Sequence, residues 1–160
     1  MSSTDLTDLA LHLFGEGNHH RIYQKLGAHA VTQDGGGGTR FAVWAPNAKR
    51  VSVVGDFNQW DGRSDVMQPR GSSGVWVTFV PNLGAGALYK FEILSQHDHL
   101  LMKSDPYGLQ MQLRPDNASI VAEIDGFEWH DGDWLAKRRE SDPLRTPISI
   151  YEFHPGSWRR

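Results

Sequence analysis

The chain has 160 residues and a formal net charge of −3, with 16 Lys and Arg against 19 Asp and Glu. This length suits one well-filled domain with flanking segments, and the weak charge argues against a surface for nucleic acid or an anionic membrane. Cysteine is absent, which excludes disulfides, thiolate metal sites and thiol nucleophiles. No stretch approaches an apolar membrane span and no basic leader opens the chain, so we expect a cytoplasmic protein without membrane contact.

The first expected element is a short helix over about Asp5–Phe14, where leucines recur close to a helical spacing. Ser3, Thr4 or Asp5 is available as its N-cap. The glycine run Gly35–Gly38 comes next and is more typical of a hairpin turn than of a phosphate cradle, because no GK[ST] sequence follows it.

Strand patterns then recur at regular intervals. Alternating apolar and polar residues predict four strands, with weaker signals near Leu100 and Ile120. The four are Thr39–Trp44, Arg50–Val54, Gly74–Val80 and Ala87–Leu94. Turn residues such as Asp61-Gly62 lie between these runs. This spacing indicates an all-β fold, an antiparallel β-sandwich.

The character of the chain changes after about Gly126. Residues up to 146 are aromatic, acidic and then charged, which predicts a linker. Ile148–His154 resembles a strand buried on both faces of a parallel sheet, but nothing follows to complete that sheet. We therefore expect a truncated chain with a lead-in at 1–24, a β-sandwich at 25–125, a linker at 126–146 and the start of a further domain at 147–160.

We expect no catalytic residue, metal or cofactor in this chain. Glu128, Asp131 and Asp133 offer carboxylates for glycoside chemistry, but neighbouring turn residues lack the buried surroundings that separate the pKa values of an acid and a base. The sequence His97-Asp98-His99 would place two imidazoles on one strand face. A third ligand at a definite spacing is absent, which favours a hairpin tip.

The most informative stretch is Val51–Gly62, where a β-run ends in glycine and a turn rich in Asn and Asp follows. Trp60 stands in this turn, outside the alternating pattern. A glucan site needs an aromatic plate for the C–H face of a sugar ring and polar groups for its hydroxyls. Trp60, Asn58 and Lys90 form such a set if neighbouring strands bring them together. The pattern equally allows Trp60 to cap the core and Lys90 to be a solvated strand residue.

Several segments resemble, in order and spacing, the successive landmarks of bacterial glycogen branching enzymes. They are Tyr23–His29, Phe41–Ala48, Val51–Arg63, Tyr89–Ile93 and Lys103–Tyr107. The end of the chain, Ser149–Arg160, resembles the start of that family's catalytic barrel, with departures at Phe153 and Pro155.

The resemblance implies a family 48 carbohydrate-binding module with an immunoglobulin-like sandwich. A (β/α)₈ barrel of the α-amylase superfamily follows in that family and carries the catalytic carboxylates, so the tail here is interpreted as its first strand. The implied parent is a glycosyltransferase of glycogen biosynthesis, which cleaves α-1,4-glucan chains and transfers them to form α-1,6 branches. Related modules in glycogen-sensing kinase subunits bind glucan through the Trp and Lys that match Trp60 and Lys90. Their second stacking Trp falls near Leu101 or Met102 here, so we expect weak binding of glycogen and maltooligosaccharides.

Three interpretations remain open. In the first, the chain is a fragment of a branching enzyme whose module positions glucan and packs on its own barrel. In the second, it is a free-standing glucan-binding or regulatory module. In the third, it is a sandwich used only for packing. Isoamylase-type debranching enzymes and trehalose-forming relatives share the module. An exposed apolar strand such as Ile148–Phe153 favours the enzyme fragment, because in a free-standing binder it would invite edge pairing. The fragment itself is expected to be inactive.

Overall fold

The computed structural model describes residues 5–33, 35–124 and 126–158. They divide into two units, one ending at Ile124 and one following it. No helix within the described residues is long and apolar enough to cross a membrane.

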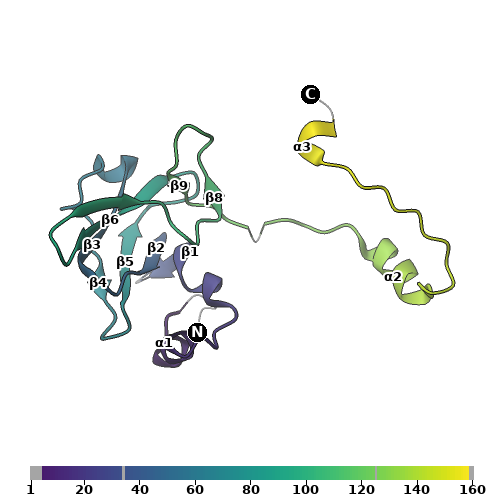
Figure 1. The fold of residues 1–160 in the computed structure, drawn as a ribbon, viewed down its shortest axis with the longest axis horizontal. Coiled ribbons are helices and arrows are strands. Elements are labelled where there is room, and N and C mark those ends of the chain that lie inside the picture. Colours follow the sequence, from purple (N-terminus) through teal and green to yellow (C-terminus); the bar gives the residue numbers. More distant parts are fainter. Residues whose placement is uncertain (1–4, 34, 125, 159–160) are drawn as a thin grey trace. The chain divides into compact units, whose positions relative to one another are not determined.

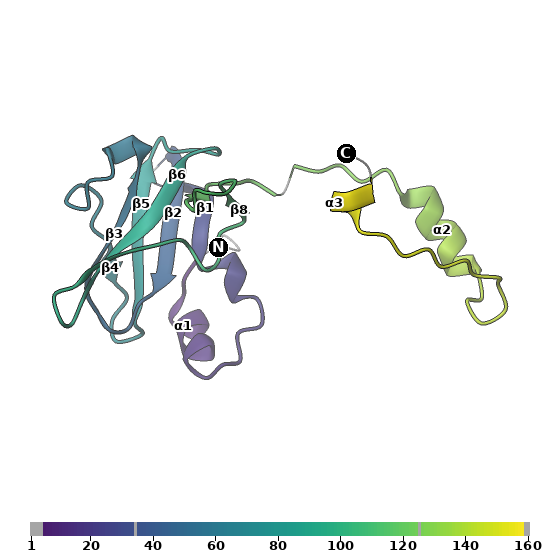
Figure 2. The same ribbon diagram turned by 45° about the horizontal axis from the view of Figure 1, so that its top comes forward.

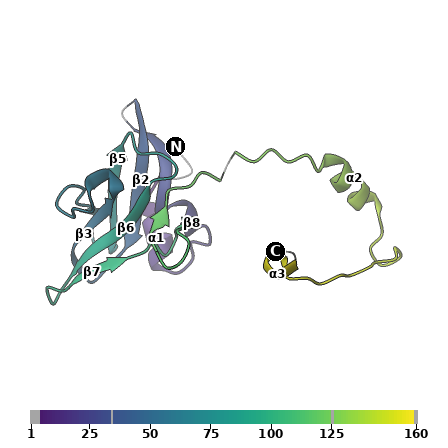
Figure 3. The same ribbon diagram turned by 90° about the horizontal axis from the view of Figure 1, so that it is seen from above.

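Two antiparallel sheets form the first unit (Figure 1). Their strands are β1 Gly27–Gln33, β2 Gly36–Trp44, β3 Ala48–Gly55, β4 Gln68–Pro69, β5 Val75–Pro81, β6 Leu88–Ser95, β7 Leu100–Lys103, β8 Gln110–Met111 and β9 Ser119–Ile120. One sheet has the order β1-β2-β5-β4 and the other β3-β6-β9-β8. Strand β7 also pairs with β6 and lies beside it in Figure 3. The predicted antiparallel β-sandwich is confirmed.

The core lies between the sheets because alternate residues of each strand point inward. Phe41 of β2 meets Tyr89 of β6 edge to face, with ring centroids 4.9 Å apart. Val51 and Val53 of β3 and Phe91 of β6 are fully buried beside them. Each such side chain contributes about 1.5–3 kcal/mol on burial.

A buried polar pair ties β6 to the segment after β7. The hydroxyl of Tyr89 donates to Asp105 Oδ2 at 2.6 Å, and the backbone N–H of Tyr107 donates to Asp105 Oδ1 at 2.8 Å. Burial raises the pKa of Asp105, and these two hydrogen bonds partly offset that rise. Burial and the neighbouring Asp105 also raise the pKa of Tyr89, so the phenol stays protonated.

The N-terminal helix α1 spans Asp8–Gly15 and lies against the β1–β2 sheet (Figure 2). It starts later than expected, since Thr7 is its N-cap and accepts from the backbone N–H of Ala10 at 3.2 Å. Of the N-caps predicted, Ser3 and Thr4 lie outside the described residues. A single turn of 3₁₀ helix, Ile22–Gln24, leads from α1 toward β1.

Three strands were not predicted. β1 lies within the expected sandwich at 25–125, before the first strand that was predicted, and β4 and β8 have two residues each. The glycine run does form a hairpin, because Gln33 of β1 pairs with Gly36 of β2. The histidines at 97 and 99 also lie at a hairpin, where the N–H of Ser95 donates to the carbonyl of His99 at 2.9 Å.

The second unit contains helix α2 over Gly132–Glu140 and the short helix α3 over Pro155–Trp158. The helix α2 lies within the expected linker and was not predicted, although its residues Leu135–Arg139 are good helix formers. The Arg138 guanidinium lies 5.2 Å from the centre of the Trp134 ring. Ile148–His154 forms no strand in the described structure, since a strand requires a neighbour to pair with. Its assignment to a barrel stays a prediction.

Candidate functional site

The segment Asp56–Val66, here named the Trp60 loop, follows β3. Its end runs beside β3, where Ser52 and Val66 form an antiparallel bridge, and its Gly62 lies against Glu92 on the outer face of the sheet that contains β3 and β6. The residues of β3 and β6 that alternate with the core residues point to this face, and Ser52 pairs with Glu92 and Val54 with Lys90. Ser52 and Val54 are nevertheless fully buried. The loop is therefore packed onto the sheet.

Asn58 holds the loop from within. Its Oδ1 accepts from the backbone N–H of Gly55 at 2.9 Å, while Nδ2 donates to the carbonyl of Val53 at 3.0 Å and to Asp65 Oδ2 at 2.7 Å. A side-chain amide has two donor hydrogens, and both are used inside the loop. Asn58 thus lies in the predicted region with its donors directed into the protein.

Trp60 is half-buried and does not belong to the sandwich core. Its backbone N–H donates to the carbonyl of Gly55 at 2.9 Å, and its indole Nε1 donates to Asp56 Oδ1 at 2.8 Å. Gln59 and Trp60 have φ values of 57° and 61°, in the left-handed region. Such backbone is maintained only where the surroundings enforce it, at about 1–3 kcal/mol per residue. The orientation of the indole is therefore fixed at both its backbone and its ring.

Lys90 is half-buried on β6, and its Nζ donates to Asn117 Oδ1 in the connection between β8 and β9. The sheet brings Lys90 close to the anchor of Trp60. Gly55, which accepts from the backbone of Trp60, pairs with Tyr89, the residue next to Lys90. The residue that anchors the backbone of Trp60 and the residue that pairs with Lys90 are thus neighbours on β3.

Sequence reasoning missed two partners of this set, Asp56 and Asn117. Asp56 stands four residues before Trp60 in the same motif, so that spacing offered a signal for it. Asn117 is 27 residues from Lys90 in the chain and carries no pattern that could have identified it.

The hairpin of β6 and β7 adds an apolar flank. Met102 pairs with Glu92 and Leu101 with Ile93. Directly opposed residues share a face, so Met102 rather than Leu101 lies on the face that carries Lys90. Its side chain is exposed there.

An exposed ion pair follows Trp60. The guanidinium of Arg63 donates from Nε and Nη2 to the carboxylate of Asp61, with the shortest distance 2.7 Å. These hydrogen bonds lower the pKa of Asp61 to about 2. The carboxylate is therefore ionised at any physiological pH.

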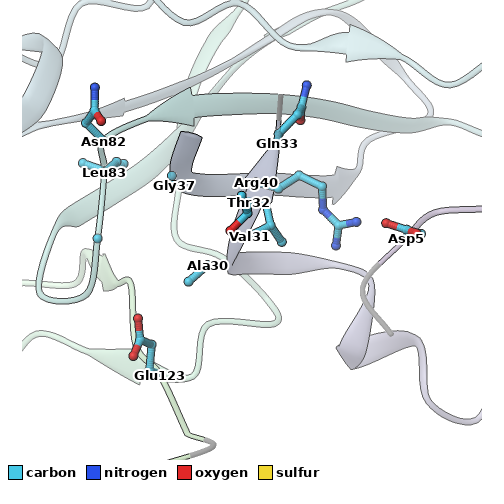
Figure 4. Close-up of a pocket in the computed structure, with 12 residues that line it drawn as sticks. Asp5, Ala30, Val31, Thr32, Gln33, Gly37, Arg40, Asn82, Leu83 and Glu123 are labelled. Atoms are coloured by element: carbon cyan, nitrogen blue, oxygen red, sulfur yellow. The ribbon is translucent and has the colours of Figure 1, made fainter. Parts of the chain in front are cut away.

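A hollow of about 1060 Å³ opens on the other sheet, beside β1 and β2. In Figure 4 the side chains of Arg40 and Asp5 face one another in it, and Asn82 and Leu83 lie at its other end. Arg40 Nη2 donates to the carbonyl of Lys25 at 2.9 Å, and burial lowers the pKa of Arg40. The described residues that line this hollow include no aromatic side chain and so offer no plate for a sugar ring.

No group of His, Asp and Glu placed to hold a metal ion occurs in residues 5–33, 35–124 and 126–158. Glu128 and Asp133 are exposed in the second unit. This exposure does not provide the enclosed surroundings in which two carboxylates act as acid and base.

The family model described as carbohydrate-binding module 48 (isoamylase N-terminal domain) matches residues 25–108. A 1,4-alpha-glucan branching enzyme GlgB from a Synechocystis strain is 59% identical over 153 residues, which are 96% of this chain and 20% of that protein. The protein of the same name from Thermosynechococcus vestitus is 58% identical over 156 residues, which are 98% of this chain and 20% of that protein. This chain therefore spans about a fifth of the length of these curated relatives.

A crystal structure of the maltotriose complex of PulA from Klebsiella pneumoniae matches with a TM-score of 0.51 and 23% identity. The match covers 62% of this chain and 11% of that chain. It shows a common fold.

Proposed function

Because the chain belongs to the carbohydrate-binding module 48 family, we propose that its β-sandwich binds α-1,4-glucan at the Trp60 loop. The single observation that supports this proposal most is the fixed indole of Trp60, held by Asp56 and anchored beside Lys90. A pyranose ring stacks its C–H face on the indole, while its hydroxyls meet the polar groups at the edge.

Lys90 and Asn117 supply that polar edge. An ammonium group has three donors, and Asn117 takes one of them. The others serve hydroxyl oxygens of the sugar. Asn58 contributes by shaping the loop, since both of its N–H groups already have partners in the protein.

Binding is weak in this proposal because the site has one aromatic plate. The resemblance to glycogen-sensing modules implies a second stacking Trp on the hairpin of β6 and β7, where Met102 stands here. By analogy with base stacking, one lost aromatic contact costs about 1–3 kcal/mol, which lowers affinity by about one to two orders of magnitude.

The similarity to GlgB proteins supports a wider proposal, that this chain is part of a cytoplasmic glycogen branching enzyme. In that protein the module packs on the catalytic barrel and positions glycogen or maltooligosaccharide chains for transfer. The alternative is a free-standing glucan-binding module or part of an isoamylase-type or trehalose-forming relative. The family assignment alone is equally compatible with that alternative.

The test is titration of the chain with β-cyclodextrin and maltoheptaose, by calorimetry and by NMR. We expect Trp60→Ala to weaken binding by about tenfold or more, since a stacking contact is worth about 1–3 kcal/mol. Trp129→Ala is the matched control, because Trp129 is 74% exposed in the second unit. Equal affinities of wild type and Trp60→Ala would show that Trp60 is not the plate.

A further inference from the structure

We infer that Glu92, buried against Gly62 of the Trp60 loop, is a positioning residue that sets the place of the Trp60 indole. The role in sugar binding rests on the proposed function, whereas the role in holding Trp60 does not. Glu92 is 8% exposed although it lies on the outer face of the β3–β6 sheet, where a carboxylate would ordinarily reach water.

A buried carboxylate requires a partner, and Arg50 supplies it. Arg50 Nη2 donates to Glu92 Oε1 at 2.8 Å. Arg50 lies on β3 and Glu92 on β6, so the ion pair also joins the two strands. The carboxylate is thereby fixed in position.

Gly62 of the Trp60 loop lies directly on this carboxylate. A Cβ at position 62 would be 2.8 Å from Glu92 Oε2 and would overlap both Oε1 and Cδ. The backbone of Gly62 is not left-handed, so its conformation does not itself require glycine. What requires glycine here is the space that Glu92 occupies.

The contact reaches Trp60 through a short backbone segment with hydrogen bonds on both sides of Gly62. Gly62 follows Trp60 by two residues, and Asp61 between them donates its N–H to the carbonyl of Asn58 at 3.1 Å. Further along, Ser64 donates its N–H to the carbonyl of Asp61 at 3.2 Å. A segment tied in this way moves as one piece, so a shift at Gly62 displaces the indole.

Glu92 and Lys90 point to the same face of β6, two residues apart. One strand therefore carries both the ammonium group of the proposed site and the carboxylate against which Gly62 of the Trp60 loop lies. The distance between plate and ammonium is set before a sugar arrives, which avoids the cost of ordering the loop on binding.

The decisive experiment combines Gly62→Ala with Glu92→Ala, singly and together. The readouts are the ¹H–¹⁵N resonance of the Trp60 indole, which senses its hydrogen bond to Asp56, and the Kd for β-cyclodextrin. We expect Gly62→Ala to shift the resonance and to weaken binding by about tenfold, as loss of a preorganised site does. In the double variant the methyl group added at position 62 occupies the space that the Glu92 carboxylate vacates and replaces its support, so the resonance and most of the affinity return.

Two variants control for general damage. Gly84→Ala is the matched glycine control, because a Cβ there meets nothing within 4 Å and should change neither readout. Glu92→Gln keeps the shape of the support and should retain the wild-type resonance, whereas Glu92→Ala alone should lose it. If Gly62→Ala does not fold, these Glu92 variants still test whether Glu92 positions Trp60.

An unchanged indole resonance in Gly62→Ala and in Glu92→Ala would overturn the inference. So would a folded double variant that resembles Gly62→Ala. Should wild type bind no sugar, the proposed function fails by itself, because the resonance still reports whether Glu92 positions Trp60.

Discussion

Replacing Asn58 with alanine separates a residue that builds the loop from one that touches sugar. The change removes three hydrogen bonds, of 2.9, 3.0 and 2.7 Å, and leaves the N–H of Gly55 and the carbonyl of Val53 without this partner. At about 1 kcal/mol net for each bond, the free energy of unfolding of the sandwich should fall by about 3 kcal/mol. For a domain of this size that lowers Tm by about 10 °C.

Urea unfolding, followed by tryptophan fluorescence and far-ultraviolet circular dichroism, measures this loss. Asn18→Ala is the control, because Asn18 is exposed and makes one long bond of 3.4 Å to Glu16. It should cost less than about 0.5 kcal/mol. Asn58→Asp should be worse than alanine at neutral pH, since it places a second carboxylate beside Asp65.

The reasoning is refuted if Asn58→Ala is as stable as wild type. If such a stable variant also lost β-cyclodextrin binding, Asn58 would be a direct sugar contact and its internal hydrogen bonds would be incidental. Sugar affinity and unfolding free energy therefore need to be measured on the same samples.

Two further predictions concern pH and activity. Burial raises the pKa of Asp105 in the folded state, so the folded chain keeps a proton that the unfolded chain releases near pH 3.9. The free energy of unfolding should therefore decline as pH rises from about 4 through the folded pKa of Asp105. This dependence on pH should vanish in Asp105→Asn. If urea titrations gave wild type and Asp105→Asn the same dependence on pH, the prediction would be contradicted. The 160-residue chain should show no branching activity in an iodine-stained amylose assay, because Glu128 and Asp133 are exposed rather than paired in an enclosed site. Activity from the pure chain would disprove that expectation.

The strands that sequence predicted are those whose alternation reflects burial on one side. In β3 and β6 the inward residues Val51, Val53 and Phe91 are fully buried, and their spacing of two was visible in the sequence. β4 and β8 escaped prediction because two residues show no period. β1 escaped because His29, Thr32 and Gln33 are polar, and its position at the edge of a sheet leaves this strand little to bury.

The residue types of the candidate site could be predicted from the sequence, but the contacts that hold these residues in place could not. Trp60 was conspicuous because a large aromatic stood in a turn of small polar residues. Lys90 could be associated with it only on the condition that neighbouring strands bring the two together, or through the resemblance, since nothing local links two residues thirty positions apart. Glu92 could not be identified from the sequence, because its burial depends on a loop that folds back over the strand and on Arg50 from the neighbouring strand.

A single aromatic side chain such as Trp60 can serve glucan binding if little of its stacking energy is spent on fixing a mobile loop. A stacked ring contributes about 1–3 kcal/mol, and fixing a mobile side chain on binding costs about 0.5–1.5 kcal/mol, so a flexible Trp60 would return little. Here Asp56, Asn58 and Glu92 hold the loop before binding. A glycogen particle presents many chain ends, so weak sites gain by repeated encounter. Loosening the loop through Glu92→Ala should therefore lower the affinity for sugar in proportion to the mobility that Trp60 gains.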